Sequence, residues 1–373
     1  MSNRLLRAAC VAAALVVIGP PPQEARAEPV GVLLTRLQGL YQKAEEAAEA
    51  YNATEAALRD RQDEEHRLAA ELGKTRRDLA AEKAVAGRLA REQYQGARGL
   101  SPFARMLLSG DPQAALDERR LAAREGARQA ALLDRLTKGE RQADRLAAAA
   151  RKARDTEAGL AGQMKERKEE VGRQLKEVER MLAALTPEEL AQLGAQEAAD
   201  TADAQRQLVT SGALGSPRTR TPTAAGGVAL TYATAQIGKP YVWGAEGPGS
   251  FDCSGLTSQA WAHAGRSIPR TSQEQWAQLP RVPLDQLRPG DLVVYFPKAT
   301  HVALYIGEGK VIQAPRPGTK VKVSPIAANP LLGAVRPDSD ATPLKEFTPP
   351  PLPESDGTAD GDDTGYSAEE SPA

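Results

Sequence analysis

Two residues of this chain have the types and surroundings that nucleophilic catalysis requires, and the first is Cys253. The 373 residues include only two cysteines, and the other, Cys10, lies in a segment that we expect to be removed on export. A lone thiol in an exported protein has no intramolecular disulfide partner. It is therefore an unused free thiol, part of an intermolecular disulfide or a reactive group. Residues 256–264 have helical spacing, so Cys253 should lie in the first turn of a helix, where unpaired N–H groups favour a thiolate. The alternative is a small buried hydrophobic residue.

The second residue is His301, because a cysteine nucleophile needs a base that becomes its counter-ion. Of the three histidines, His66 lies far upstream in a charged helical segment. His263 lies ten residues beyond the cysteine on the same expected helix, about 15 Å along its axis at ~1.5 Å per residue. His301 opens an expected strand 48 residues after Cys253 (301 − 253). Its alternative is an ordinary histidine at a strand end.

The base in turn needs an orienting group, and Gln313 on the following strand is the candidate. Residues 307–310 read as a hairpin turn. Counted from this turn in a simple register, we expect Gln313 to share a face of the sheet with His301. Its amide oxygen can accept the imidazole N–H. The alternative is a solvent-facing strand residue.

The composition changes sharply along the chain. The net charge is −1 and aromatic residues make up 4%, which gives no indication of nucleic-acid binding. Residues 1–27 have the basic start, short apolar run and Ala-Arg-Ala sequence of a secretory signal peptide, so the mature chain should start near Glu28. No later run is long and apolar enough for a transmembrane anchor. We therefore expect an exported, soluble protein.

Residues 28–185 are predicted to form a coiled-coil helical hairpin, because apolar residues at three-four spacing follow two stretches separated by a Gly/Pro breaker. Pairing with another chain is the alternative. An apolar cluster beside the breaker either docks a partner or caps the hairpin: Phe103, Met106, Leu107 and Leu108. Residues 186–227 are predicted as a flexible linker with one short helix opening at Thr186, and residues 338–373 as a disordered Pro/acid-rich tail.

Residues 228–337 are the segment with a globular composition, and they are long enough for one core. Helical patterns come first, including a capping box at 271–274. Strand patterns follow over 291–296, 301–307 and 310–314, with weaker ones after them. Helices followed by strands predict an α+β domain with a mainly antiparallel sheet.

Five ordered motifs in this domain resemble those of the NlpC-type cell-wall peptidases, which are papain-like cysteine endopeptidases of bacterial peptidoglycan. They are Tyr-Val-Trp-Gly at 241–244, Phe-Asp-Cys-Ser-Gly at 251–255, Ile-Pro-Arg-Thr-Ser-Gln at 268–273, Arg-Pro-Gly-Asp-Leu at 288–292 and His-Val-Ala-Leu-Tyr-Ile-Gly at 301–307. The layout of signal, coiled coil, linker and C-terminal domain resembles secreted actinobacterial members.

The resemblance implies a papain-like fold and specific roles for residues. Cys253 would be the nucleophile, His301 the base, and Gln313 the third residue, at a position that varies among His, Asn, Gln and Glu in the family. Residues near the oxyanion or the peptide substrate would be Tyr241, Asp252, Ser254 and Arg270.

The function expected from this resemblance is hydrolysis of an amide in peptidoglycan stem peptides, at the bond between D-glutamate and diaminopimelate, by a secreted, cell-wall-associated enzyme. It would serve wall remodelling or cell separation. With no metal-ligand cluster in the sequence, we expect no cofactor. The coiled coil would bind a membrane or divisome protein, or cover the catalytic cleft. The alternatives are a coiled-coil scaffold with an inactive wall-binding domain, and acyl transfer on the same residues.

Overall fold

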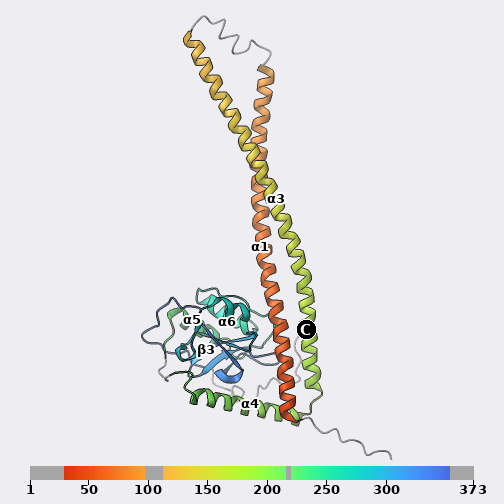
Figure 1. Ribbon diagram of the computed structural model, residues 1–373, viewed down its shortest axis with the longest axis vertical. Coiled ribbons are helices and arrows are strands. Elements are labelled where there is room, and N and C mark those ends of the chain that lie inside the picture. The colour runs from red at the N-terminus through yellow and green to blue at the C-terminus, as the bar shows by residue number, and fades with distance from the viewer. Residues whose placement is uncertain (1–28, 97–111, 216–219, 353–373) are drawn as a thin grey trace, which may run out of the picture.

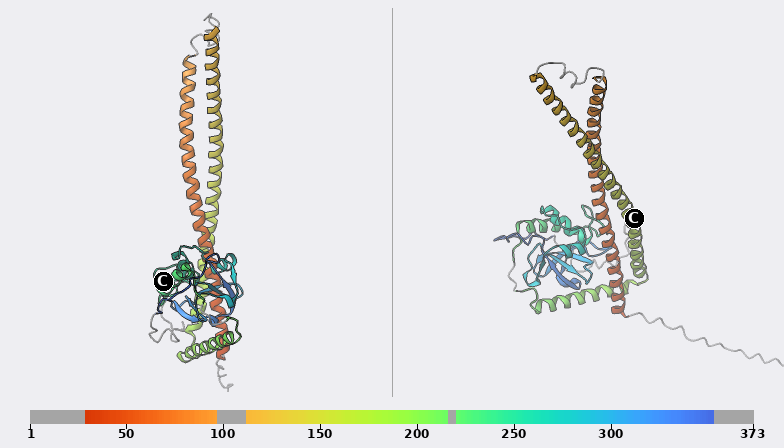
Figure 2. Two further views of the ribbon diagram at one scale, coloured as in Figure 1. Left: turned by 90° about the vertical axis from the view of Figure 1, so that its left-hand side faces the viewer. Right: turned by 45° about the horizontal axis from the view of Figure 1, so that its top comes forward.

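The computed structural model describes residues 29–96, 112–215 and 220–352. Two long helices, α1 (Val30–Gly96) and α3 (Pro112–Ala183), run along one another, and the α+β domain lies beside the base of α1 (Figure 1). Figure 2 shows the same arrangement from two further sides. Among the described helices, none combines the length and the apolar character needed to cross a membrane. The expected signal peptide and the Phe103–Leu108 cluster lie outside the described residues.

The helical hairpin is packed most tightly at its base. Leu33, Leu34 and Leu37 of α1 are buried there against Val178 of α3 and Leu193 of the next helix. Farther along, exposed leucines become frequent on α3: Leu116, Leu121 and Leu133. The predicted pair of long helices is present, whereas a regular coiled-coil repeat stays a prediction.

The predicted flexible linker is wrong over much of its length, because α4 (Pro187–Thr210) occupies it. Thr186 and Glu189 form a complete capping box at its start, which satisfies helical N–H groups that would otherwise lack partners. Leu193 is buried against the hairpin, and Leu208 packs on the α+β domain. Two apolar anchors at opposite ends make α4 a strut between the two regions (Figure 1).

The sheet of the α+β domain has six strands in the order β1-β6-β2-β3-β4-β5, and each neighbouring pair is antiparallel. The strands are β1 (Arg281–Val282), β2 (Leu292–Tyr295), β3 (His301–Gly307), β4 (Lys310–Gln313), β5 (Lys322–Pro325) and β6 (Leu331–Val335). Helices α5 (Ala224–Thr234), α6 (Cys253–His263) and α7 (Ser272–Gln278) precede them, with short 3-10 turns at Leu284–Gln286 and Ile326–Ala328. The α+β prediction is confirmed.

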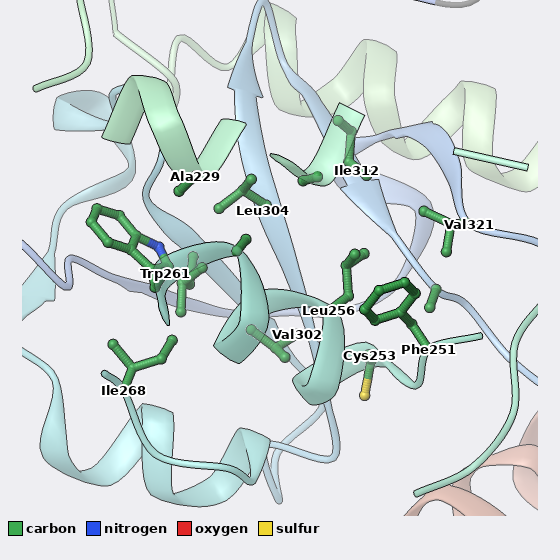
Figure 3. Close-up of a cluster of buried hydrophobic side chains, with 14 of the residues drawn as sticks. Ala229, Phe251, Cys253, Leu256, Trp261, Ile268, Val302, Leu304, Ile312 and Val321 are labelled. Atoms are coloured by element: carbon green, nitrogen blue, oxygen red, sulfur yellow. The ribbon is translucent and has the colours of Figure 1, made fainter. Parts of the chain in front are cut away.

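Each face of the sheet carries its own apolar core, because alternate strand residues point to opposite sides. Val302 and Leu304 pack with Leu256 and Trp261 of α6 (Figure 3). Ala303 and Tyr305 belong to the cluster on the other face, against which Leu208 of α4 packs. The sheet is thus held between the α5–α6 layer and the end of α4.

The segment after β6 also differs from the prediction. Residues 338–352 lie along the α+β domain instead of leaving it as a disordered tail. Asp338 is buried, and its carboxylate accepts hydrogen bonds from Arg288 and from the Thr223 hydroxyl. Phe347 packs over Gly227. A buried ion pair and an aromatic contact hold this otherwise polar segment, while residues 353–373 lie outside the described part.

Candidate active site

Cys253 is the first residue of α6, as the helical spacing after it predicts. Asp252 caps the helix, since its Oδ1 accepts a hydrogen bond of 2.6 Å from the Gly255 N–H. A Cβ at Gly255 would lie 2.2 Å from the Ala245 carbonyl oxygen, so this turn requires glycine. Figure 3 shows the Cys253 sulfur directed away from the apolar core beneath it. The Asp-Cys-Ser-Gly sequence therefore encodes a capped turn that presents a thiol.

His301 and Gln313 meet as expected, with 2.7 Å between His301 Nε2 and Gln313 Oε1. The amide oxygen only accepts, so Nε2 carries the proton and Nδ1 is left as the basic nitrogen. The two side chains meet, but the simple register expected from the turn is wrong, because the pairing shifts between Tyr305 and Gly307. Carried unchanged from the Gly307–Lys310 pair, it would place Gln313 opposite Leu304, on the wrong face. The irregularity brings the two side chains together.

The thiol and the imidazole are both buried, and this opposes their charged forms. Burial raises the pKa of Cys253 well above its usual value, and Glu49, Asp252 and Glu45 raise it further. The backbone N–H of Val302, next to His301, lowers it. Burial lowers the pKa of His301 to about 4. In this conformation the pair therefore rests as a neutral thiol and a neutral imidazole.

The predicted substrate-side residues cluster beside Cys253. Arg270 donates to both carboxylate oxygens of Asp252, at 3.1 and 2.7 Å, and to Ser254 Oγ at 2.8 Å. Tyr241 is buried, and the pKa of its phenol is raised well above its usual value by burial first and by the charge of Cys253 second. All four predicted positions, 241, 252, 254 and 270, thus surround the thiol.

Helix α1 occupies the space in front of these residues. Glu49 Oε1 accepts a hydrogen bond of 2.7 Å from Ser254 Oγ and lies 3.6 Å from Cys253 Sγ. Its Oε2 accepts one of 3.1 Å from the Ser272 N–H. One turn earlier, Glu45 Oε1 lies 3.7 Å from His301 Nδ1. The Cys253 thiol and the His301 imidazole therefore face two successive turns of the same helix.

Further contacts fasten α1 around this point. Asn52 donates to Asp252 Oδ2 at 3.0 Å, and the ring of Tyr51 lies 4.9 Å from that of Trp243 in an edge-on arrangement. Ion pairs at the rim join Arg59 to Glu246 and Lys298 to Glu46, both at 2.9 Å. The Arg316 guanidinium lies over the Tyr41 ring and binds Glu197 of α4. The interface thus extends over about five turns of α1.

Sequence reasoning missed Glu45, Glu49 and Asn52 entirely. They are spaced four and three residues apart, which places them on one face of a helix. In a helix rich in alanine and charge, that spacing is indistinguishable from an ordinary solvated face. The unusual signal was the pair of tyrosines, Tyr41 and Tyr51, on either side of the two glutamates.

The described residues contain a groove of about 480 Å³ between α4, α1 and the segment before β6, lined by Gln38, Asp200 and Asn329 among others. None of Cys253, His301 and Gln313 lines it. No group of three His, Cys, Asp or Glu side chains in the described ranges is arranged to hold a metal ion.

Comparisons with known proteins concern this α+β domain. The NlpC/P60 family model matches residues 238–333. A probable endopeptidase of Corynebacterium glutamicum is 47% identical over 116 residues, which are 31% of this chain and 56% of that protein. One from Mycobacterium tuberculosis is 37% identical over 119 residues, 31% of each chain. The matches therefore span roughly a third to just over half of these relatives.

Solved structures match the same region. The NlpC/p60 domain of the peptidoglycan hydrolase SagA is 34% identical, and the match covers 30% of this chain and 97% of that one with a TM-score of 0.28. RipD of Mycobacterium tuberculosis, described as a non-catalytic NlpC/p60 protein adapted to peptidoglycan binding, is also 34% identical, with 30% and 96% coverage and a TM-score of 0.28. By its sequence, this chain carries an NlpC/P60 domain that contains Cys253 and His301.

Proposed function

We propose that this protein is an exported, cell-wall-associated cysteine endopeptidase that hydrolyses an amide bond in peptidoglycan stem peptides. The observation that carries the proposal is the arrangement of three side chains. Cys253 opens a capped helix, and His301 donates Nε2–H to Gln313 at 2.7 Å. This leaves His301 Nδ1 free to act as a base. The NlpC/P60 match and the probable-endopeptidase relatives support the same reading.

The proposed reaction has two halves. His301 Nδ1 takes the thiol proton, and the Cys253 sulfur attacks the amide carbonyl carbon. The backbone N–H of Cys253 and the Tyr241 hydroxyl stabilise the oxyanion. The C–N bond then breaks while Nδ1–H protonates the leaving amine. In the second half, Nδ1 deprotonates a water that attacks the thioester, which releases the acid product and restores the thiol.

The bond between D-glutamate and diaminopimelate is the proposed target, by resemblance to the NlpC-type peptidases. The test uses residues 186–352, which keep α4, the Thr223–Asp338 contact and the packed segment after β6. Incubated with defined muropeptides, this fragment should yield a product ending in D-glutamate, identified by mass spectrometry. Cys253→Ala should yield none. Cleavage by the Cys253→Ala protein would overturn the mechanism.

A non-catalytic wall-binding protein is the second candidate, because RipD, which is 34% identical over the matched region, is described as non-catalytic. The lack of catalysis is a property of RipD. In this chain, the arrangement of Cys253, His301 and Gln313 favours catalysis. The two candidates differ in outcome. Retention on insoluble peptidoglycan without any released peptide would favour binding, and formation of a new amide with an added amine would favour acyl transfer.

We also propose that α1 keeps the enzyme inactive until a membrane or divisome partner moves it. Glu49, Glu45 and Asn52 occupy the positions that a substrate would need beside Cys253 and His301. If the closed conformation is favoured by a few kcal/mol, only about 0.1–10% of molecules are open. The fragment 186–352 should then cleave about tenfold to a thousandfold faster than the full chain. Equal rates per active site would contradict autoinhibition.

A further inference from the structure

Glu45 and Glu49 bring two carboxyl groups into a buried site that already holds an acidic side chain. Glu49 is 3% exposed and Glu45 is 8% exposed. They lie one turn apart on α1 and face the start of α6 and the start of β3. Enclosing a carboxylate is costly unless a cation or several hydrogen-bond donors compensate for it.

The cation that acts on Glu49, Arg270, is already engaged. Arg270 holds both oxygens of Asp252 and lies 3.2 Å from Glu246. Glu49 itself contacts the Ser254 hydroxyl, the Ser272 N–H and the Cys253 sulfur. A hydroxyl serves a protonated carboxyl group as well as a carboxylate, because it both donates and accepts.

The surroundings of Glu45 indicate more directly that its carboxyl group is protonated when α1 covers the site. Glu45 Oε1 and His301 Nδ1 are 3.7 Å apart, and neither carries a hydrogen when the carboxyl is ionised and the ring is neutral. The other oxygen, Oε2, is buried without a hydrogen-bond partner. Arg316 is the cation facing Glu45, and it binds Glu197 in a two-point contact.

We propose that α1 is a proton-dependent latch, in which the carboxyl groups of Glu45 and Glu49 take up protons as the helix closes over Cys253 and His301. Rising pH then releases the helix and exposes the thiol. This inference rests on the proposed occlusion of the site by α1, and it adds the condition under which the occlusion gives way. It does not require that the domain hydrolyse any particular bond.

The direction follows from the two conformations. Burial raises the pKa of Glu49 to about 7, with Asp252 as the second cause. Burial likewise raises the pKa of Glu45 well above its usual value, with Glu49 second and Arg316 opposing. The charged or titratable groups that face the two carboxyls are Asp252, Cys253, Arg270, Tyr241, His301 and Arg316.

On an open, solvated helix both carboxyls would titrate near their ordinary value of about 4.3. The closed conformation therefore binds more protons between about pH 4.3 and the closed-state pKa, which for Glu49 is about 7. Opening releases these protons, so the two carboxyl groups act to increase the open fraction with pH across that window. His301, whose pKa burial lowers to about 4, acts in the opposite direction. Below the window both carboxyl groups are protonated in both conformations, so they contribute no pH dependence to the open fraction.

The test measures exposure of Cys253 in the chain from Glu28 onward, where it is the only cysteine. When opening is rare and reclosing is fast, the observed rate constant of alkylation by iodoacetamide has two factors. It equals the equilibrium constant for opening multiplied by the rate constant for alkylation of the open conformation. The reference is the double variant E45Q/E49Q, because glutamine is the neutral counterpart of a protonated carboxyl. Thiolate formation and the titration of His301 are common to both proteins and cancel in the ratio of their rates.

The wild-type to E45Q/E49Q ratio should rise about tenfold or more between about pH 5 and about pH 7. Glu46→Gln is the matched control, since it removes a carboxylate on the same helix that pairs with Lys298 at the rim. The ratio of its alkylation rate to that of E45Q/E49Q should rise with pH as steeply as the wild-type ratio does.

Two results would overturn the latch, and they are distinguishable. Slow alkylation of both wild type and E45Q/E49Q, with the same dependence on pH, would mean that α1 covers the thiol without taking up protons. Labelling of the wild-type chain at about pH 5 as fast as that of a free thiol peptide would mean that α1 does not cover Cys253 at all. Neither readout depends on hydrolysis, so failure of the proposed enzymatic activity would be recognised separately.

Discussion

Glu49 Oε1 accepts a hydrogen bond of 2.7 Å from Ser254 Oγ, although the two residues are 205 positions apart. Ser254 directly follows the cysteine, so this contact ties the first long helix to the turn that presents the thiol. The same carboxyl group also binds the Ser272 N–H at the start of α7. One side chain of α1 thus holds two separate segments of the NlpC/P60 domain.

Asn52→Asp should activate the full chain. Asn52 Nδ2 donates to Asp252 Oδ2 at 3.0 Å, and an aspartate there would place two carboxylates in contact, which disfavours the closed conformation. We expect muropeptide cleavage by the full chain to rise about tenfold or more. Ala53→Asp adds the same charge at the next, exposed position and should leave the rate unchanged. Equal effects of both variants would contradict the prediction.

Gln313→Ala should impair catalysis without impairing substrate binding. It removes the acceptor of the His301 Nε2–H and leaves the buried ring free to rotate. A misplaced base costs about a hundredfold in rate, so kcat of the 186–352 fragment should fall by about that factor while KM changes little. Gln313→Glu keeps an acceptor and should restore most of kcat, with the pH–rate profile displaced upward by the added negative charge. A large rise in KM for Gln313→Ala would instead point to substrate contact.

Removal of α1 should make the thiolate form at lower pH. In the closed protein, burial and then Glu49 raise the pKa of Cys253. In the 186–352 fragment the thiol is solvated and both glutamates are absent. Titration of thiolate ultraviolet absorbance should therefore give a lower midpoint for the fragment than for the chain from Glu28 onward. Coincident titration curves would show that α1 has no electrostatic influence on the Cys253 thiol.

Gly255→Ala should destabilise the domain. The added Cβ would lie 2.2 Å from the Ala245 carbonyl oxygen, and relief of such a clash costs about 1–3 kcal/mol. Urea unfolding of the 186–352 fragment measures this loss. Gly249→Ala is the control, because no atom lies within 4 Å of its added Cβ. Its free energy of unfolding should match that of the wild type, and equal losses in both variants would refute the steric explanation.

Local sequence was sufficient for part of the turn that presents the Cys253 thiol and for much of the sheet. The helical spacing after Cys253 predicted its place in the first turn of a helix, which the structure confirms. The cap by Asp252 and the lack of space at Gly255 became evident only in the structure. The hairpin from His301 to Gln313 was likewise visible in strand patterns around a turn. Its register was not, because the strand patterns give no sign of the shift between Tyr305 and Gly307.

Only the tertiary structure decided what covers the site and where the domain ends. Glu45, Glu49 and Asn52 have ordinary helical spacing, and their burial arises from docking between segments about 200 residues apart. The same holds for Asp338. The polar composition around it predicts a disordered segment, whereas in the folded domain its carboxylate pairs with Arg288. Sequence patterns report periodicity within an element, whereas contacts between distant elements depend on the shape and charge of both surfaces.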